Sequence, residues 1–226
     1  MKYDEKYFET RLRGYGCHGG YSRMKNQIQK LHLGCLKRLG LGLERGNGKS
    51  ALDVGCGYGY FCEILQSFGY EVYGTDISRH AILNAKVLLD SKVELMIHDA
   101  QEPFPFKKNF NLITCFDTLE HLERPELTIQ HCYNSLKSGG IFIASTPNIY
   151  SPYKLFLKDT THLNEKTIQE WRNIFSILEW FSLETYTLQW IPIFQSLISQ
   201  KRSFTNSFIL NIPIFGFHIF FIAKKY

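Results

Sequence analysis

The stretch Ala51–Phe61, ALDVGCGYGYF, carries three glycines within five residues and an aspartate two positions before the first of them. The short apolar run 50–55 predicts a buried strand, and residues 60–69 have apolar side chains at helical spacing up to a closing glycine. The glycines therefore lie where a strand turns into a helix. Bare backbone at such a turn lets a ligand approach closely.

Strand and helix patterns alternate on both sides of this turn. Further strands are predicted at 70–76, 93–99, 110–117 and 141–148, and further helices at 24–41, 78–90, 125–140 and 164–175. The strands are mostly continuous apolar runs, which are typical of strands buried on both faces. The pattern predicts an α/β fold, in which a mostly parallel sheet carries helices on both of its faces.

The last part of the chain departs from this alternation. Two aromatic-rich segments, 179–191 and 216–225, have strand patterns without a helix of normal length between them. They predict an antiparallel pair at the edge of the sheet. The most apolar stretch, 208–223, is interrupted and falls short of the ~20 residues that a membrane helix needs. It predicts strands, and contact with a membrane surface stays open.

Length and composition favour a single cytoplasmic domain. The chain has 226 residues, 44% of them hydrophobic, which is enough for one sizeable core. Its net charge of +5 comes without a long basic run, so nucleic acid is not an expected partner. The charged N-terminus lacks the apolar core of a signal peptide, and the six cysteines form no CxxC pair, which favours reduced thiols.

Three carboxylates follow the predicted strands. Asp53 belongs to the glycine turn, Asp76 ends the second strand and Asp99 ends the third. A carboxylate beside the turn disfavours a phosphate ligand, and a dinucleotide fingerprint would need a glycine where Tyr60 stands. Asp76 is placed to accept ribose hydroxyls, and Asp99 to accept an adenine amino group. The three acids together fit a positively charged nucleoside without a phosphate.

Several ordered motifs resemble those of the class I S-adenosylmethionine-dependent methyltransferases. They are LDVGCGYG (52–59), GTDIS (74–78), HDAQEPFPF (98–106), FNLITCFDTLEHL (110–122) and SLKSGGIFIASTPN (135–148). The resemblance covers roughly residues 48–148. It implies a Rossmann-like methyltransferase fold, with a doubly wound, mostly parallel sheet of seven strands whose last strand is antiparallel.

The same resemblance implies S-adenosylmethionine as cofactor and S-adenosylhomocysteine as product. It places the methionine part at the glycine turn, the ribose on the acid after the second strand and the sulfonium beside the end of the fourth. The residues that it assigns to the cofactor are Asp53, Gly55, Gly57, Gly59, Asp76, Ile77, Asp99, Ala100, Phe116 and Arg23.

The candidate catalytic residues are His121 and His162, each of which follows a predicted strand. In one interpretation, either histidine acts alone as a base or orients the substrate. In another, both join Asp117 and Glu120 around a divalent cation such as Mg²⁺. That set resembles the E-x-x-E-H of ubiquinone-biosynthesis O-methyltransferases and small-RNA 2′-O-methyltransferases, but the first acid here is Asp117. In a third, Glu120 and His121 only support the local helix, and no metal ligand is assigned.

The predicted function is methyl transfer from S-adenosylmethionine to an oxygen or nitrogen of a small-molecule acceptor. No N/D-P-P-Y follows the fourth strand, and basic residues do not interleave with aromatic ones as a nucleic-acid groove requires. Alternatives are a non-catalytic S-adenosylmethionine-binding protein and a metal-assisted O-methyltransferase acting on a larger metabolite or an RNA end. An NAD-linked oxidoreductase is disfavoured, and a homodimer stays open.

We expect one methyltransferase domain over residues 1–226, with three parts. Residues 1–48 form a helical cap, 49–148 the cofactor-binding core, and 149–226 the acceptor-side elements and edge strands. In the cap, the aromatic residues expected to close over the cofactor are Tyr3, Tyr7, Phe8, Tyr15 and Tyr21. In the last part, those expected to line the acceptor pocket include Trp171, Trp180 and Trp190, and packing on the sheet is an equal alternative for Trp180 and Trp190.

Overall fold

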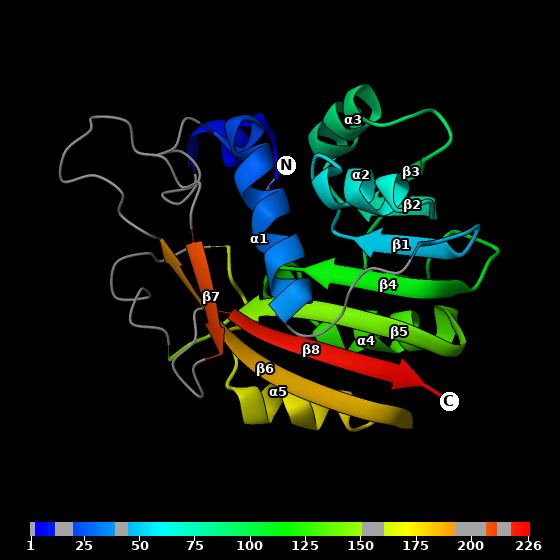
Figure 1. The fold of residues 1–226 in the computed structure, drawn as a ribbon, viewed down its shortest axis with the longest axis vertical. Coiled ribbons are helices and arrows are strands. Elements are labelled where there is room, and N and C mark those ends of the chain that lie inside the picture. The colour runs from blue at the N-terminus through cyan, green and yellow to red at the C-terminus, as the bar shows by residue number, and fades with distance from the viewer. Residues whose placement is uncertain (1–2, 12–19, 39–44, 151–160, 193–206, 212–217) are drawn as a thin grey trace.

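The computed structural model of the chain describes residues 3–11, 20–38, 45–150, 161–192, 207–211 and 218–226. This part of the chain is built on one sheet of eight strands in the order β3-β2-β1-β4-β5-β8-β6-β7 (Figure 1). The strands are β1 (Ser50–Val54), β2 (Glu71–Asp76), β3 (Glu94–Ile97), β4 (Phe110–Phe116), β5 (Leu136–Pro147), β6 (Trp180–Pro192), β7 (Ser207–Asn211) and β8 (His218–Lys225).

The five strands from β3 to β5 are parallel to their neighbours, and β8 is antiparallel to both β5 and β6. This arrangement confirms the predicted fold class, including the antiparallel last strand. The predicted β6–β8 pair is antiparallel and lies at the expected end of the sheet, with β8 on its inner side next to β5. An eighth strand, β7, pairs with the end of β6 and forms the outer edge in the described residues.

Helices cover both faces of the sheet, as a doubly wound fold requires. On one face, α1 (Lys25–Arg38), α2 (Tyr60–Ser67) and α3 (Arg79–Leu88) contribute to one apolar core cluster. On the other, α4 (Pro125–Ser135) and α5 (Ile168–Phe175) contribute to a second (Figure 1). None of the described helices has both the length and the apolar character needed to cross a membrane.

Local sequence signals set the helix boundaries. The hydroxyl of Ser78 accepts a hydrogen bond from the N–H of Ala81 and caps α3, as the sequence predicts. Thr167 and Glu170 form a capping box at the start of α5. The helix predicted over 125–140 ends earlier, at Ser135, because Leu136 already pairs with β4.

The second core cluster corrects one expectation about the acceptor pocket. Trp171 is fully buried, and Trp180 stacks near Phe142, both on the face that α4 and α5 cover. These two tryptophans therefore pack the sheet, and the side chain of Trp190 lies outside the described residues. The five described cysteines are free and buried, and Cys17 lies outside the described part.

Candidate functional site

The glycine turn joins β1 to α2 in a backbone conformation that favours glycine. Gly55, Gly57 and Gly59 have φ angles of +72°, +54° and +78°. A Cβ atom at Gly55 would collide with the side chain of Thr118, and one at Gly57 would lie 3.1 Å from the hydroxyl of Tyr21. The turn therefore needs both the conformational freedom and the missing side chains that the sequence predicts.

Asp76 lies at the end of β2, directly against this turn. Its Oδ2 accepts a hydrogen bond from the N–H of Gly57 at 2.9 Å, and its Oδ1 accepts one from the N–H of Ser78 at 2.8 Å. Burial raises the pKa of Asp76 in spite of these two bonds. The carboxylate is thus fixed between the glycine turn and the start of α3, where the sequence places a ribose.

Asp53, which the sequence assigns to the cofactor, points into the core beneath the turn. Only 3% of it is exposed, and its carboxylate accepts hydrogen bonds from Thr114 Oγ1 at 2.7 Å and from Cys62 Sγ at 3.6 Å. Burial raises its pKa to about 7. These contacts make Asp53 a brace between β1, β4 and α2.

The residues predicted for the adenine surround the end of β3. Ile77 is 47% exposed, although it is a large apolar side chain next to Asp76. The N–H of His98 donates to the carbonyl of Asp76 at 2.9 Å, which brings the ends of β2 and β3 together. Asp99 accepts the N–H of Gln101 at 2.9 Å, and Ala100 is buried beside it. An apolar face and a carboxylate therefore lie on the same side as Asp76.

Two other predicted cofactor residues lie further along this edge. Phe116, at the end of β4, is buried, and its ring stacks on His32 with a centroid separation of 4.5 Å. Arg23 is exposed on the short helix η3 (Tyr21–Met24). Its neighbour Tyr21 lies over Gly57, so this helix adjoins the turn, and a contact between Arg23 and a cofactor stays a prediction.

Both predicted catalytic histidines meet Glu120 after β4. Glu120 and His121 belong to the 3₁₀ helix η4 (Leu119–His121). The backbone carbonyl of Glu120 accepts hydrogen bonds from the N–H groups of Leu163 and Asn164. These bonds bring His162 beside His121, with ring centroids 4.8 Å apart. Donor atoms of Glu120, His121 and His162 all lie within 4.8 Å of one another, so they form a cluster that could hold a metal ion.

Asp117, the fourth residue proposed for a cation site, is not part of that cluster. Its φ angle of +48° turns the chain before η4 begins, so Asp117 and Glu120 do not share one helical face. The carboxylate instead accepts a hydrogen bond from Ser145 Oγ at 2.8 Å, and lies 3.3 Å from Nε2 of His218. The expectation of four ligands around one cation is therefore corrected to three.

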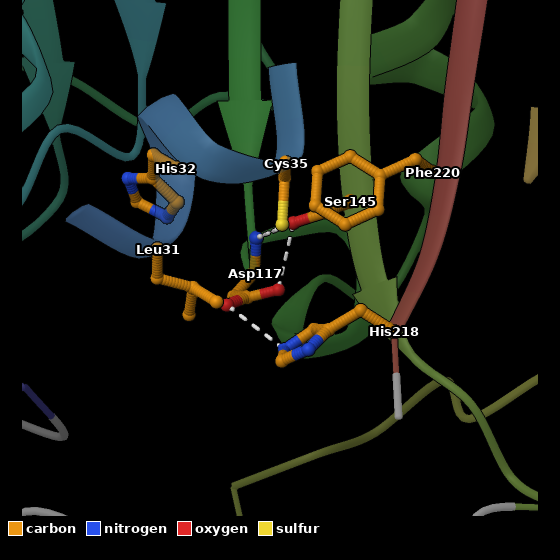
Figure 2. Close-up of a pocket in the computed structure, with 7 residues that line it drawn as sticks. All are labelled: Leu31, His32, Cys35, Asp117, Ser145, His218 and Phe220. Atoms are coloured by element: carbon orange, nitrogen blue, oxygen red, sulfur yellow. Dashed lines mark hydrogen bonds and ion pairs between the residues drawn. The ribbon is translucent and has the colours of Figure 1, made fainter. Parts of the chain in front are cut away.

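Asp117 opens into a small cavity of about 10 Å³, which we call the β4-end pocket (Figure 2). It is lined by Leu31, His32, Cys35, Asp117, Ser145, His218 and Phe220. Burial opposes ionisation of Asp117, but the nearby His218 and His32 hold its pKa well below the usual range. Burial lowers the pKa of His32 to about 4 and raises that of Cys35 to about 12. At neutral pH Asp117 is therefore an ionised carboxylate, whereas the imidazole of His32 and the thiol of Cys35 are neutral.

Three residues of this pocket, His32, Ser145 and His218, are not among those predicted from the sequence. Their signal was weak, because each comes from a different element. His32 and His218 lie in none of the motifs, and nothing in the motif 135–148 distinguishes Ser145 from its neighbours. In β8, however, the side chains of His218 and Phe220 alternate with those of Ile219 and Phe221, which face the other core cluster. This alternation, together with an antiparallel last strand, places His218 opposite Pro147 at the end of β5.

Aromatic residues from the N-terminal segment cover the glycine turn. Tyr7 and Phe8 are buried in a cluster with Tyr58 and Tyr60, and Tyr21 packs against it. Glu9 accepts a hydrogen bond from Tyr58 at 2.8 Å and ties this segment to the turn. Tyr3 also packs here, and Tyr15 lies outside the described residues.

Comparison with known proteins supports the geometry. A family model described as a methyltransferase domain matches residues 24–191, which is more than half of the chain. The curated relatives include ubiquinone biosynthesis O-methyltransferases from Glaesserella parasuis, 32% identical over 158 residues, and from Azoarcus sp., 36% identical over 109 residues. These alignments cover 62% and 45% of this chain, and the chain spans only 65% and 45% of the two relatives.

Solved structures show the same fold at lower identity. An S-adenosylmethionine-dependent methyltransferase from Archaeoglobus fulgidus has a TM-score of 0.64 at 23% identity, covering 87% of this chain and 94% of its own. A Thermotoga maritima protein described as a possible histamine N-methyltransferase has a TM-score of 0.67 at 16% identity, covering 91% and 94%. The chain therefore belongs to the methyltransferase domain family and has the fold of S-adenosylmethionine-dependent methyltransferases.

Proposed function

We propose that the protein transfers a methyl group from S-adenosylmethionine to a hydroxyl oxygen of a small-molecule acceptor. The observation that carries this proposal is the hydrogen bond between Gly57 and Asp76. It joins a turn without side chains to a fixed carboxylate, and the turn packs through Gly55 against Thr118 at the end of β4. A nucleoside site and a set of proton-accepting side chains therefore adjoin each other at one edge of the sheet.

For the cofactor, we propose a placement that follows the strand ends. The methionine part lies along Gly55 and Gly57, Asp76 accepts the ribose hydroxyls, and the adenine packs on Ile77 near Asp99. The exposure of Ile77 supports this placement, because an adenine would cover an apolar side chain that is otherwise half in water. Asp76 already binds two backbone N–H groups, and the remaining lone pairs of its oxygens are available for hydroxyl donors.

An oxygen acceptor is favoured over a nitrogen acceptor by two observations. S-adenosylmethionine supplies a methyl group that its sulfonium already activates, so the protein must mainly align the nucleophile and remove its proton. Histidines gather at the relevant edge, including the predicted catalytic pair His121 and His162. Curated relatives from Glaesserella parasuis and Azoarcus sp. are named ubiquinone biosynthesis O-methyltransferases.

The donor set at η4 does not fit Mg²⁺. Magnesium prefers an octahedron of oxygen ligands, whereas this cluster offers the imidazoles of His121 and His162 with one carboxylate, that of Glu120. Two imidazoles and a carboxylate are a set that Zn²⁺ or Fe²⁺ would accept. Asp117, which would add an oxygen, is engaged by Ser145 and His218. We therefore assign no step of the reaction to Mg²⁺.

We propose that the chain works as one domain with the three parts expected from its sequence. The aromatic cover over the turn supports a capping role for the N-terminal part, because it would keep water from the sulfonium. The β4-end pocket, which takes side chains from α1 and β8, supports an acceptor site built from both ends of the chain.

The direct test uses S-adenosylmethionine with a labelled methyl group and a panel of hydroxylated aromatic and aliphatic small molecules. Label should move to at least one hydroxyl compound, and the transfer should stop when S-adenosylhomocysteine is added in excess. Binding of S-adenosylhomocysteine without transfer to any compound would instead favour a non-catalytic binding protein. Transfer to amines alone would contradict the oxygen acceptor.

A further inference from the structure

We propose that His218 is the base that removes the proton from the acceptor hydroxyl, and that Asp117 and Ser145 position it. The inference rests on the proposed function. It adds His218 and Ser145, which are not among the predicted site residues, and it gives Asp117 a role other than cation binding. Its starting point is the β4-end pocket, where His218 meets Asp117 (Figure 2).

The geometry of the His218–Asp117 pair fixes the orientation of the imidazole. Nε2 of His218 lies 3.3 Å from Oδ2 of Asp117. The other carboxylate oxygen, Oδ1, accepts a hydrogen bond from Ser145 Oγ at 2.8 Å. An ionised carboxylate can only accept, so the proton between the pair belongs to Nε2, and the ring lone pair lies on Nδ1. A histidine whose ring is oriented by a carboxylate, here that of the half-buried Asp117, is an arrangement well suited to a general base.

The electrostatics of the pocket favour the same assignment. The titratable groups that line it are His32 and Cys35 from α1, Asp117 after β4 and His218 from β8. Cys35 keeps its proton, because burial raises its pKa to about 12, and the lowered pKa of His32 keeps that ring neutral. Asp117 is therefore the one anion in the pocket lining, and it would stabilise the imidazolium that forms when His218 takes a proton.

The size of the cavity indicates which part of the acceptor enters it. A volume of about 10 Å³ is near the ~10–15 Å³ that one water molecule needs. It has room for a hydroxyl group, whereas the rest of the acceptor must lie outside. Nδ1 of His32 is buried and has no hydrogen-bond partner among the described residues, so it offers that hydroxyl a second polar contact.

The pocket also lies beside the expected position of the sulfonium. Phe116, which the family resemblance places there, stacks on His32. Thr118, on the other side of Asp117, touches the glycine turn at Gly55. Asp117, which lines the pocket, therefore lies in the chain between Phe116 and Thr118, the two residues next to the expected position of the methyl donor.

The proposed step is balanced without any further reactant. A lone pair of the acceptor oxygen forms the new bond to the methyl carbon, and the carbon–sulfur bond breaks with its electron pair left on sulfur. The hydroxyl proton moves to His218, so the positive charge of the sulfonium passes to the imidazolium. The products are the methyl ether and S-adenosylhomocysteine, and the imidazolium then releases its proton to solvent.

His121 and His162, the histidines expected from the sequence, lie in a different cluster from His218. Nδ1 of His121 lies 3.3 Å from the carbonyl oxygen and 3.1 Å from the hydroxyl of Thr161. Nδ1 of His162 pairs with Glu165 at 2.9 Å. Both rings belong to the Glu120 cluster and do not line the β4-end pocket. The proposal therefore separates His218 from them, and the experiment compares all three.

The test uses two acceptor probes that differ in acidity, catechol and 4-nitrocatechol. The nitro group makes the second probe largely ionised at neutral pH, so it needs no base. The variant His218→Gln should lower the kcat for catechol by roughly 100-fold, the scale of general-base catalysis, and that for 4-nitrocatechol by less than ~5-fold. Asp117→Asn should show the same selectivity. His131→Gln, a matched change on α4 at the opposite face, should alter neither rate.

Other patterns of rate loss would contradict the proposed role of His218 or the proposed acceptor. An equal loss on both probes would show that His218 is only structural, and no loss on either would show that it is not the base. Selective loss in His121→Gln or His162→Gln, without loss in His218→Gln, would move the role to the Glu120 cluster. If the wild type binds S-adenosylhomocysteine but methylates neither probe, it is the proposed hydroxyl acceptor that fails. Melting temperatures of all variants check folding, and Asp117→Asn serves if His218→Gln is unstable.

Discussion

The backbone N–H of Gly57 donates a hydrogen bond to Oδ2 of Asp76 at 2.9 Å, and this bond ties the glycine turn to the end of the second strand. The two residues are 19 positions apart, yet adjacent parallel strands bring their ends together. A ligand that uses the bare backbone of the turn must therefore also meet the carboxylate. This single relationship explains why the glycines and the acid occur at this spacing.

The first prediction concerns Asp76. Asp76→Asn should weaken S-adenosylhomocysteine binding by at least about 30-fold, because hydrogen bonds from ribose hydroxyls to a charged acceptor are worth roughly 1.5–3 kcal/mol each. Calorimetric titration measures the change. Asp90→Asn, an exposed aspartate beyond α3, is the matched control and should bind as the wild type does. Unchanged affinity in Asp76→Asn would remove the ribose assignment.

The second prediction concerns the close packing of Gly55. Gly55→Ala should lower the free energy of unfolding by at least about 1 kcal/mol more than Gly139→Ala does. Both glycines have similar positive φ angles, +72° and +73°, so both variants carry the same left-handed strain. Only at Gly55 does the new Cβ collide with Thr118, whereas nothing lies within 4 Å of that atom at Gly139.

Urea denaturation of the two variants measures this difference. In the double variant Gly55→Ala with Thr118→Ala, part of the lost stability should return, because the colliding hydroxyl and methyl groups are gone. Equal costs for Gly55→Ala and Gly139→Ala would show that the contact with Thr118 does not constrain the turn.

How much of this site could be predicted from the sequence depends on how local each signal is. The glycine turn, Asp76 and the strand–helix alternation follow from short-range patterns, and the structure places them as expected. The separation of Asp117 from Glu120 does not, because it depends on one left-handed residue that only the folded chain reveals. His218 was missed for another reason: it reaches Asp117 from a strand about a hundred residues later.

Burial also could not be judged from the pattern alone. Asp53 looks like a ligand contact because it precedes the glycines, but β1 is buried along its whole length, and its carboxylate faces Thr114. The tryptophans look like a pocket lining because they are large and aromatic. Trp171 is instead at the centre of the core under α5, where helical spacing rather than ligand chemistry explains it.

The third prediction concerns Ile77, which is 47% exposed beside Asp76. Ile77→Ala should weaken S-adenosylhomocysteine binding by roughly tenfold, because the adenine would lose apolar contact worth about 1.5 kcal/mol. Val87→Ala, which truncates a more exposed apolar side chain on α3, should leave binding unchanged. A drop of the same size in both variants would point to a general effect on α3 and against an adenine contact.

The fourth prediction concerns the pH dependence of stability through Asp53. Burial raises its pKa to about 7 in the folded protein, from an ordinary value of 3.8. Between these values the unfolded chain releases the proton and the folded chain keeps it. The free energy of unfolding should therefore fall as pH rises from about 4 to about 7, by up to ~4 kcal/mol, and stay level above that.

Asp53→Asn isolates this contribution, because asparagine does not titrate and its carbonyl oxygen can still accept from Thr114. The stability of the variant relative to the wild type should increase from pH 4 to pH 7 in urea denaturation experiments. A difference that stays constant over this range would mean that Asp53 is already ionised in the folded protein.

The fifth prediction concerns metal ions. Mg²⁺ should change neither S-adenosylhomocysteine affinity nor the rate of methyl transfer, because the donors of Glu120, His121 and His162 include two imidazoles. Chelation by EDTA followed by addition of Mg²⁺ tests this in the transfer assay. A rate of methyl transfer that depends on Mg²⁺ in the wild type, but not in His121→Gln, would support the metal-assisted mechanism instead.

The central claim is that the edge formed by the glycine turn and Asp76 binds the nucleoside of S-adenosylmethionine. Calorimetric titration of the purified wild-type protein with S-adenosylhomocysteine, alongside NADH, tests it most directly. We predict one S-adenosylhomocysteine site per chain, with an affinity at least about 30-fold lower in Asp76→Asn, and no heat from NADH. No binding of S-adenosylhomocysteine, or binding of NADH in its place, would contradict the account.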